Sequence, residues 1–181
     1  EGTAIMDERR SVAVVDVGST AIRMVVAEIL PDGNWRTIDR AVKPLSLGRD
    51  VFMSRYISRE SMQLAINTLS GYCELLATWG ISPEEVQIIA TSAIRESRNR
   101  DTFVDRVYLR TGLKIDTVEG IEENHLTYLA VEHAVKQEYT QFSRSNSLII
   151  EVGGGSTELM LLRRGKMVAA HSLRIGTLRL E

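Results

Sequence analysis

The chain has 181 residues, of which 44% are hydrophobic and 25% are charged, and its formal net charge is −2. This composition is typical of a folded protein long enough for one large domain, or for one domain and part of a second. The charge argues against generic nucleic-acid binding, which needs a basic surface, so we expect no DNA partner. No apolar run of about 18 residues occurs, and we therefore expect no membrane span.

The single cysteine and the first ten residues indicate the cellular compartment to expect. Cys73 is the only cysteine, so neither a disulfide framework nor a cysteine-based zinc site is expected. Residues 1–10 are polar and charged and do not form a signal peptide. Together these features lead us to expect a cytoplasmic protein.

The beginning of the chain predicts three antiparallel strands. Val12–Asp16 is a short apolar run that predicts a buried strand, and Ile22–Ile29 predicts a second. Pro31–Asn34 is a strong hairpin signal, after which Trp35–Leu45 predicts a third strand. Residues 16–20, the first turn, join the first two strands with an acid, a glycine and two hydroxyl side chains.

The next part of the chain predicts a loop and then a long helix. Ser46–Tyr56 contains Gly48 and is predicted to be a loop. Apolar residues at spacings of three and four predict an amphipathic helix over Arg59–Trp79. Ser58 is a good N-cap for that helix, and Gly80 is a good stop signal.

A group of candidate phosphate ligands follows the next strand. Val86–Ala90 predicts a compact strand, and Thr91, Ser92 and Arg95 come just after its carboxyl end. Open α/β sheets bind ligands at such ends. Hydroxyl groups can donate to a phosphate, and an arginine can hold one through two hydrogen bonds.

Two acidic residues open the last predicted helix. Thr102–Arg110 predicts a helix, Lys114–Val118 a strand and Ile121–Val135 a further helix. Glu122 and Glu123 fall in the first turn of that helix, where the helix dipole stabilises carboxylates. Alternatively, one of the two carboxylates faces a cleft and acts as a general base for water.

Residues 151–157, the second turn, repeat the pattern of the first turn. The strand Leu148–Val152 carries Glu151 near its end, and Gly153–Gly155 then leads into Ser156 and Thr157. Glycines can adopt a positive φ and let the backbone approach a ligand. Backbone N–H and hydroxyl groups can then wrap a phosphate, and the acid can hold a metal ion against it. Two ordinary glycine hairpins are the alternative.

The repeated turns predict two related lobes with a phosphate held between them. Residues 136–146 read as a polar connection, and the strands Glu158–Leu162 and Met167–Leu173 complete a second antiparallel set. We place the first lobe at residues 1–119 and the beginning of the second at residues 120–181. The second lobe looks truncated, because the sequence ends amid an ordered-looking pattern.

Four segments together resemble the exopolyphosphatase and guanosine pentaphosphate phosphohydrolase family. In chain order they are Asp16–Thr20, Ala90–Arg95, Glu119–Glu123 and Val152–Glu158. The resemblance covers nearly all of the chain from residue 12 to residue 176. It implies an α/β fold with an actin-like or ribonuclease H-like lobe, in which a mixed five-stranded sheet carries helices, followed by the beginning of a similar lobe.

The resemblance also implies roles for individual residues. Glu123 matches the general base that activates water, and Arg95 is a second catalytic candidate. The implied phosphate ligands are Gly18, Ser19, Thr20, Thr91, Ser92, Arg95, Gly153, Gly154, Gly155, Ser156 and Thr157. The acids implied to lie beside a divalent cation, usually Mg²⁺, are Asp16, Glu151 and Glu158.

The implied activity is release of terminal phosphate from inorganic polyphosphate or guanosine pentaphosphate by metal-assisted attack of water. The implied partners are polyphosphate or guanosine penta- and tetraphosphate, without a membrane, and we keep a homodimer of the full-length protein among the expected assemblies. Two positions differ from the family pattern, which has Asp in place of Glu151 and Asn in place of Thr20.

These two differences keep a regulatory function open as an alternative to the hydrolase. An extra methylene moves a carboxylate by about 1.5 Å, and a misplacement of order 1 Å can cost about 100-fold in rate. One alternative is therefore a catalytically weak module that binds guanosine tetraphosphate or polyphosphate for regulation. The resemblance leaves a second alternative, because the family is similar to the actin-like, sugar-kinase and heat-shock-chaperone ATPase superfold. That alternative is an ATP-dependent kinase or ATPase of this superfold, which would need an adenosine pocket.

Overall fold

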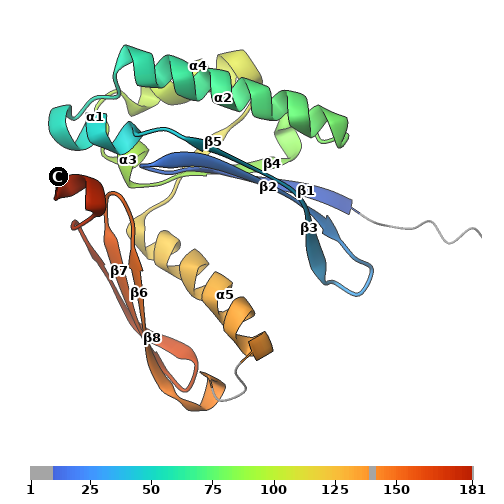
Figure 1. The fold of residues 1–181 in the computed structure, drawn as a ribbon, viewed down its shortest axis with the longest axis vertical. Coiled ribbons are helices and arrows are strands. Elements are labelled where there is room, and N and C mark those ends of the chain that lie inside the picture. The colour runs from blue at the N-terminus through green and yellow to red at the C-terminus, as the bar shows by residue number, and fades with distance from the viewer. Residues whose placement is uncertain (1–9, 139–141, 181) are drawn as a thin grey trace, which may run out of the picture.

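The computed structural model describes residues 10–138 and 142–180, which form two sheets joined by a long helix (Figure 1). The first sheet has five strands in the order β3-β2-β1-β4-β5. β1 pairs antiparallel with β2 and parallel with β4, so the expected mixed sheet is confirmed. The strands are β1 (Arg10–Val17), β2 (Ala21–Ile29), β3 (Trp35–Pro44), β4 (Val86–Ala90) and β5 (Ile115–Thr117).

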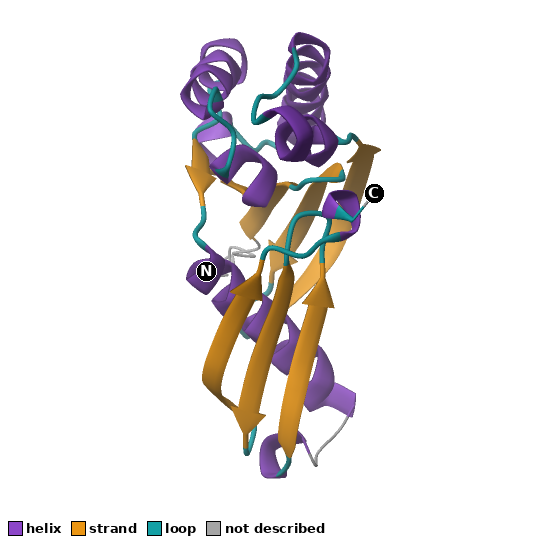
Figure 2. Ribbon diagram, turned by 90° about the vertical axis from the view of Figure 1, so that its left-hand side faces the viewer, coloured by secondary structure: helices purple, strands orange, loops and turns teal. Residues whose placement is uncertain are grey.

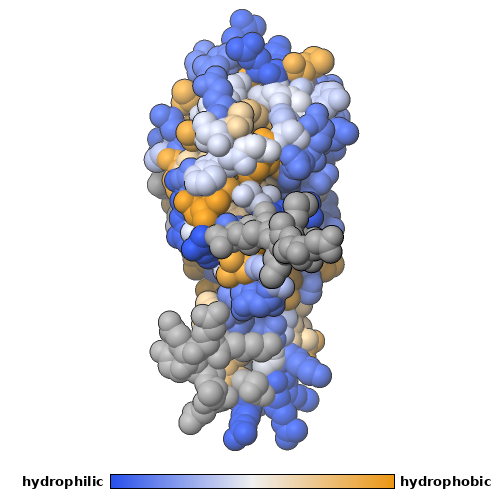
Figure 3. Space-filling model, turned by 90° about the vertical axis from the view of Figure 1, so that its right-hand side faces the viewer, coloured by the Kyte–Doolittle hydropathy of each residue, from blue (hydrophilic) through white to orange (hydrophobic). Residues whose placement is uncertain are grey.

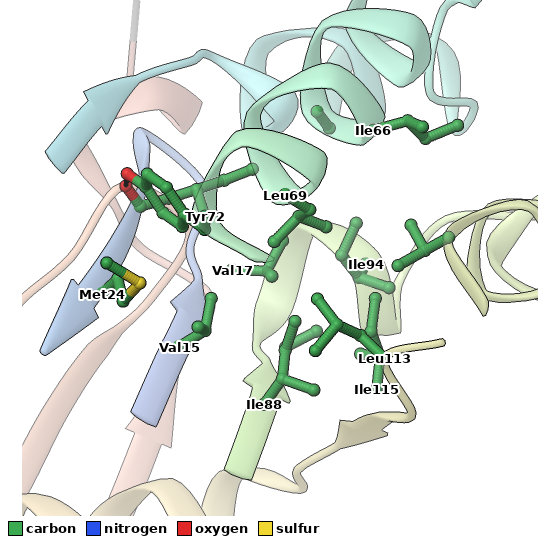
Figure 4. Close-up of a cluster of buried hydrophobic side chains, with 14 of the residues drawn as sticks. Val15, Val17, Met24, Ile66, Leu69, Tyr72, Ile88, Ile94, Leu113 and Ile115 are labelled. Carbon is green, nitrogen blue, oxygen red and sulfur yellow. Dashed lines mark hydrogen bonds between the residues drawn. The ribbon is translucent and has the colours of Figure 1, made fainter. Parts of the chain in front are cut away.

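Two long helices cover one face of the first sheet (Figure 1). They are α2 (Arg59–Thr78) and α4 (Arg100–Thr111). The predicted N-cap of α2 is confirmed, since the side chain of Ser58 accepts a hydrogen bond from the backbone N–H of Ser61 at 3.1 Å. Leu69 of α2 and Val17 of β1 are fully buried in the core between helices and sheet (Figure 4).

The predicted loop over residues 46–56 is wrong, because most of it forms helix α1 (Leu47–Ser54). Leu47 and Val51, one helical turn apart, are both fully buried. Gly48 packs against the first turn, and its backbone N–H donates to the carbonyl of Ser19 at 2.9 Å. Burial against the rest of the molecule thus outweighs weak local helix signals here.

The second sheet has three antiparallel strands in the order β6-β7-β8. They are β6 (Asn146–Val152), β7 (Thr157–Arg163) and β8 (Lys166–Leu173). Helix α5 (Gly120–Glu138) lies behind this sheet in the view of Figure 2. The shorter segments are α3 (Ser92–Arg95), η1 (Pro83–Glu85), η2 (Phe142–Arg144) and η3 (Thr177–Arg179).

One face of the second sheet is apolar and exposed. Leu148, Ile150 and Val152 alternate along β6, so they share a face, and their exposed fractions are 57%, 58% and 62%. Leu161 of β7 lies opposite Leu148 and is 47% exposed. On the side of the molecule that Figure 3 shows, apolar surface likewise gathers around the middle, among polar residues.

Two further expectations concern the polar connection before the second sheet and the boundary between the two lobes. Part of the predicted polar connection over residues 136–146 lies outside them, while α5 extends to Glu138 and η2 follows. α5 begins at Gly120, where we place the boundary between lobes, and that boundary stays a prediction. Within residues 10–138 and 142–180, the helices are too short or too polar to cross a membrane.

Candidate functional site

The first and second turns border one cavity of about 500 Å³. Each turn joins two antiparallel strands, and the two close in the same way. The N–H of Gly18 donates to the carbonyl of Ala21 at 3.0 Å, and the N–H of Gly153 donates to the carbonyl of Ser156 at 2.8 Å. The predicted site residues that line the cavity are Asp16, Gly18, Ser19, Thr20, Thr91, Ser92, Glu123, Glu151, Gly153, Gly154, Gly155 and Ser156.

Parallel pairing of β1 with β4 brings the first turn beside the residues that follow β4. The backbone N–H of Thr91 donates to the carbonyl of Val17 at 3.3 Å. The hydroxyl groups of Ser19 and Ser92 are hydrogen-bonded to each other at 3.0 Å and are buried. The carboxyl end of β4 therefore contributes to the cavity, as its place in the sequence predicts.

The glycines of the second turn are needed for space rather than for a positive φ. None of the glycines at 153–155 has a positive φ, so that part of the prediction is wrong. A Cβ on Gly154 would lie 2.9 Å from Cγ2 of Thr20, and a Cβ on Gly155 would lie 2.5 Å from Cζ of Phe52. Both distances are shorter than a normal carbon–carbon contact. Glycine thus lets the second turn pack directly on the first turn and on α1.

Helix α5 presents one face to the cavity through Glu123, Leu126 and Thr127, which share a face because they are spaced by three and four residues. Glu122 has a different role, since its Oε2 accepts a hydrogen bond from the backbone N–H of Glu119 at 2.9 Å. This is one half of a capping box, which stabilises the start of a helix. Of the two acids, Glu123 is therefore the one that faces the cavity.

Arg95 lies directly against Glu123. Its Nη1 is 3.3 Å from Oε2 of Glu123 and donates to the carbonyl of Val118 at 2.6 Å. Burial raises the pKa of Glu123 above its ordinary value, Arg95 counteracts the shift, and the charges of Glu158 and Glu151 add to it. A raised carboxyl pKa suits a general base, whose pKa works best near the operating pH.

Three predicted residues lie outside the cavity lining, as far as the described residues define it: Arg95, Thr157 and Glu158. Thr157 donates through Oγ1 to the carbonyl of Ile175 at 2.6 Å. Oε1 of Glu158 accepts a hydrogen bond from Ser172 at 2.8 Å. The predicted phosphate contacts of Arg95 and Thr157, and the predicted metal contact of Glu158, stay predictions.

Arg23 lines the cavity although it was not among the predicted site residues. Its Nη1 lies 3.3 Å from Oδ2 of Asp16. Burial raises the pKa of Asp16, Arg23 lowers it, and the charge of Glu151 raises it further. A signal for Arg23 was present in the sequence, because the hairpin register places it directly opposite Asp16.

Thr127 also lines the cavity and was likewise not among the predicted site residues. It is hydrogen-bonded to Glu151, the acid of the second turn. Its Oγ1 donates to Oε2 of Glu151 at 2.6 Å. Glu151 lines the cavity in spite of its longer side chain. The hydrogen bond fixes the direction of that side chain, because it connects β6 to α5.

The acids suit a hard divalent cation only when phosphate is also bound. Within residues 10–138 and 142–180, no three acidic, histidine or cysteine side chains gather closely enough to hold a metal ion alone. Mg²⁺ is usually held by one or two carboxylates together with phosphate oxygens and water. Asp16 and Glu151 supply such carboxylates in the lining. Oε2 of Glu158 is buried and lacks a hydrogen-bond partner among the described residues.

A model of the Ppx/GppA phosphatase family matches residues 25–181. The chain belongs to this family. A Ppx/GppA relative from Photobacterium profundum, a guanosine-5'-triphosphate,3'-diphosphate pyrophosphatase, is 30% identical over 165 residues, which are 91% of this chain and 31% of that protein. A bifunctional 3-dehydroquinate synthase/phosphatase from Fusobacterium nucleatum is 27% identical over 172 residues, or 93% of this chain and 25% of that protein.

Solved structures confirm the expected actin-like fold. The Ppx/GppA family member of Aquifex aeolicus is 29% identical, with a TM-score of 0.77, over 95% of this chain and 53% of that chain. An exopolyphosphatase from Cytophaga hutchinsonii has a TM-score of 0.85 at 24% identity, over 94% of this chain and 52% of that chain. The present Ppx/GppA chain thus spans about half the length of these solved relatives, and a quarter to a third of the curated ones.

Proposed function

We propose that the protein containing this chain hydrolyses a phosphoanhydride bond at the end of inorganic polyphosphate or of the 5′-triphosphate of guanosine pentaphosphate. The observation that carries the proposal is the cavity itself. Two turns rich in hydroxyl and N–H groups and a carboxyl group with a raised pKa line the same space. Relatives named as guanosine pentaphosphate pyrophosphatase and as exopolyphosphatase support the same chemistry.

The two turns supply the groups that bind the substrate phosphates. In this proposal the N–H groups and hydroxyls of residues 19–20 and 154–156 donate to oxygens of neighbouring phosphates. Arg23 adds a positive charge within the lining. Because the turns touch each other, their donors are fixed relative to one another before the substrate arrives, and such fixed positioning supplies much of the acceleration in phosphoryl transfer.

The chemical step falls to Glu123. Its carboxylate takes a proton from a water molecule, whose oxygen attacks the terminal phosphorus in line with the bridging oxygen. The bond from phosphorus to the bridging oxygen breaks, and that oxygen leaves with the shortened chain. Arg95, 3.3 Å from Glu123, holds the carboxylate in place and favours its charged form. Such a base typically contributes about 10²–10⁴-fold to the rate.

A divalent cation fits this arrangement for an electrostatic reason. The described residues that line the cavity include three acids, Asp16, Glu123 and Glu151, but a single arginine, Arg23. A polyanion bound beside these acids therefore needs further positive charge. Asp16 and Glu151 would hold the cation, and Glu158 stays a predicted ligand. When bound, the ion offsets the charge of the phosphate oxygens. The homodimer of the full-length protein also remains a prediction.

The regulatory alternative differs from the proposal in turnover. It keeps the binding surface and lacks efficient turnover, and Glu151 and Thr20 are the residues that favour it. The hydrogen bond from Thr127 to Glu151 at 2.6 Å supports the hydrolase instead, since it gives the longer acid a defined direction. The family match likewise gives the kinase alternative less support than the phosphatase.

The test is phosphate release by the full-length protein containing this chain. Long-chain polyphosphate and guanosine pentaphosphate are assayed separately with Mg²⁺, for the wild type, Glu123→Gln and Glu122→Gln. We expect Glu123→Gln to lower kcat by about 10²–10⁴-fold while KM stays within a few-fold. Glu122→Gln is the matched control, because it removes a neighbouring charge that caps α5, and it should retain kcat.

Two results would count against the hydrolase. Unchanged turnover in Glu123→Gln would remove the assigned base. A wild-type protein that binds either substrate without releasing phosphate would favour the regulatory alternative.

A further inference from the structure

Arg179 connects three elements that lie far apart in the sequence. It stands at the end of η3, which lies beside α1 at the red end of the chain in Figure 1. Its Nε donates to the carbonyl of Gly155 in the second turn, and its Nη2 lies 2.6 Å from Oε1 of Glu96. The guanidinium also sits 4.0 Å above the ring of Phe52 in α1.

Glu96 is the anchor of this contact on the side of the first sheet. Its side chain is only 7% exposed, and it follows directly after Arg95. Arg55 approaches it at 3.3 Å and Arg174 at 4.0 Å, but their side chains are 52% and 74% exposed. The side chain of Arg179 is 17% exposed. The bond to Arg179 is therefore the shortest and the most enclosed of the three.

The backbone on either side of Arg179 is fastened to the second turn. The N–H groups of Thr177 and Leu178 donate to the carbonyls of Gly153 and Gly154, both at 3.0 Å. Residues 177–179 and the second turn are thus tied together at several points. A force that holds Arg179 in place also holds the second turn in place.

We propose that Arg179 is a positioning residue. It holds the second turn against Glu96 and Phe52, which pack beside the first sheet, so that both turns contact the same phosphate chain. The inference rests on the proposed function for its kinetic consequence, while the contact itself can be tested without turnover. Glu96 is its partner. The enclosed, charge-assisted bond resists screening better than a surface pair.

An arginine is required for this role because one planar group makes all three contacts. The guanidinium donates from Nε and Nη2 in different directions and stacks on the Phe52 ring. A lysine keeps the charge but offers a single ammonium group on a flexible stem. Arg179→Lys should therefore lie between the wild type and Arg179→Met in every measurement.

The chain offers a matched control in Arg36. Its Nε lies 2.6 Å from Oε2 of Glu28, the same distance as in the Arg179 pair, but Arg36 is 60% exposed and joins β3 to β2 away from the cavity. Arg36→Met removes an arginine–glutamate pair of equal length and leaves both turns unaltered.

The experiment compares wild type, Arg179→Lys, Arg179→Met and Arg36→Met in the full-length protein. Steady-state phosphate release from long-chain polyphosphate gives kcat and KM, and hydrogen exchange reports on the backbone of residues 47–54 and 151–157. For Arg179→Met we expect KM to rise about 10-fold, the factor typical of losing a charge-assisted hydrogen bond, with a smaller change in kcat. Exchange should speed up in those two segments, and Arg36→Met should match the wild type.

Each outcome supports or overturns the positioning role of Arg179. Exchange and KM in Arg179→Met that equal those of Arg36→Met would overturn the proposal, and so would exchange that rises equally in β1 and β4. If the wild type releases no phosphate, the proposed function fails, while exchange in residues 151–157 still decides the role of Arg179. If Arg179→Met does not fold, Arg179→Lys and Glu96→Gln give the same test with smaller expected changes.

Discussion

Replacing Gly155 with alanine tests whether the close packing of the second turn on Phe52 of α1 and on Ser92 is needed for activity. Gly155 does not have a positive φ, so the substitution adds no backbone strain and acts only through the added methyl group. That group would lie 2.5 Å from Cζ of Phe52 and would also meet Oγ of Ser92. A normal contact is about 3.5–4.0 Å, so the second turn must move away by about 1 Å.

The cost of this movement can be stated for stability and for catalysis. Overpacking of this kind typically costs about 1–3 kcal/mol, which corresponds to a fall in Tm of roughly 5 °C. A displacement of about 1 Å in a positioning group can cost about 100-fold in rate. We therefore expect kcat/KM for phosphate release by Gly155→Ala to fall about 100-fold, far more than its stability suggests.

Gly71→Ala is the control for Gly155→Ala. Gly71 lies inside α2, and among the described residues no atom comes within 4 Å of the position its Cβ would take. Alanine there should raise stability by up to about 1 kcal/mol through helix propensity and leave the kinetics unchanged. A Gly155→Ala protein whose kcat/KM stays within about 3-fold of the wild type would refute the reasoning.

Three further predictions concern the acids of the cavity. Because burial raises the pKa of Glu123 above its ordinary 4.5, kcat/KM should fall as the pH drops through a pKa above that value, and a pH profile whose acidic limb lies below 4.5 would contradict this. The same shift adds stability at low pH that is lost as the pH rises through the folded-state pKa, as urea unfolding at several pH values can show. Thr127→Val removes the hydrogen bond to Glu151, and it should raise the Mg²⁺ concentration for half-maximal activity about 10-fold; Thr127→Ser should restore the wild-type value.

The parts of the site that could be predicted from the sequence have local signals. An apolar strand, an acid, a glycine and two hydroxyls stand together in each turn, so the strand pairs and the cavity between them follow from residues close in the chain. Glu123 has a similar signal, because it opens a helix beside a glycine. Arg23 and Thr127 could have been added from register and helical spacing, since Arg23 lies opposite Asp16 and Thr127 is four residues after Glu123.

The remaining features depend on contacts between distant residues. α1 forms because Leu47 and Val51 become fully buried, and nothing within residues 46–56 announces that burial. A run of glycines is equally consistent with positive φ and with close packing, and only the position of Phe52 decides for packing. Arg179 is 83 residues from Glu96, so their pairing could not be inferred from spacing.

The exposed face of the second sheet affects how these residues behave in solution. Leu148, Ile150 and Val152 stand on β6, an outer strand of that sheet, and each is more than half exposed. An outer strand with a row of exposed apolar side chains can pair with a strand of another molecule, and a large apolar patch promotes aggregation. The described residues, taken by themselves, would therefore be prone to concentration-dependent aggregation through this face of the second sheet, which reaches the cavity lining at Val152.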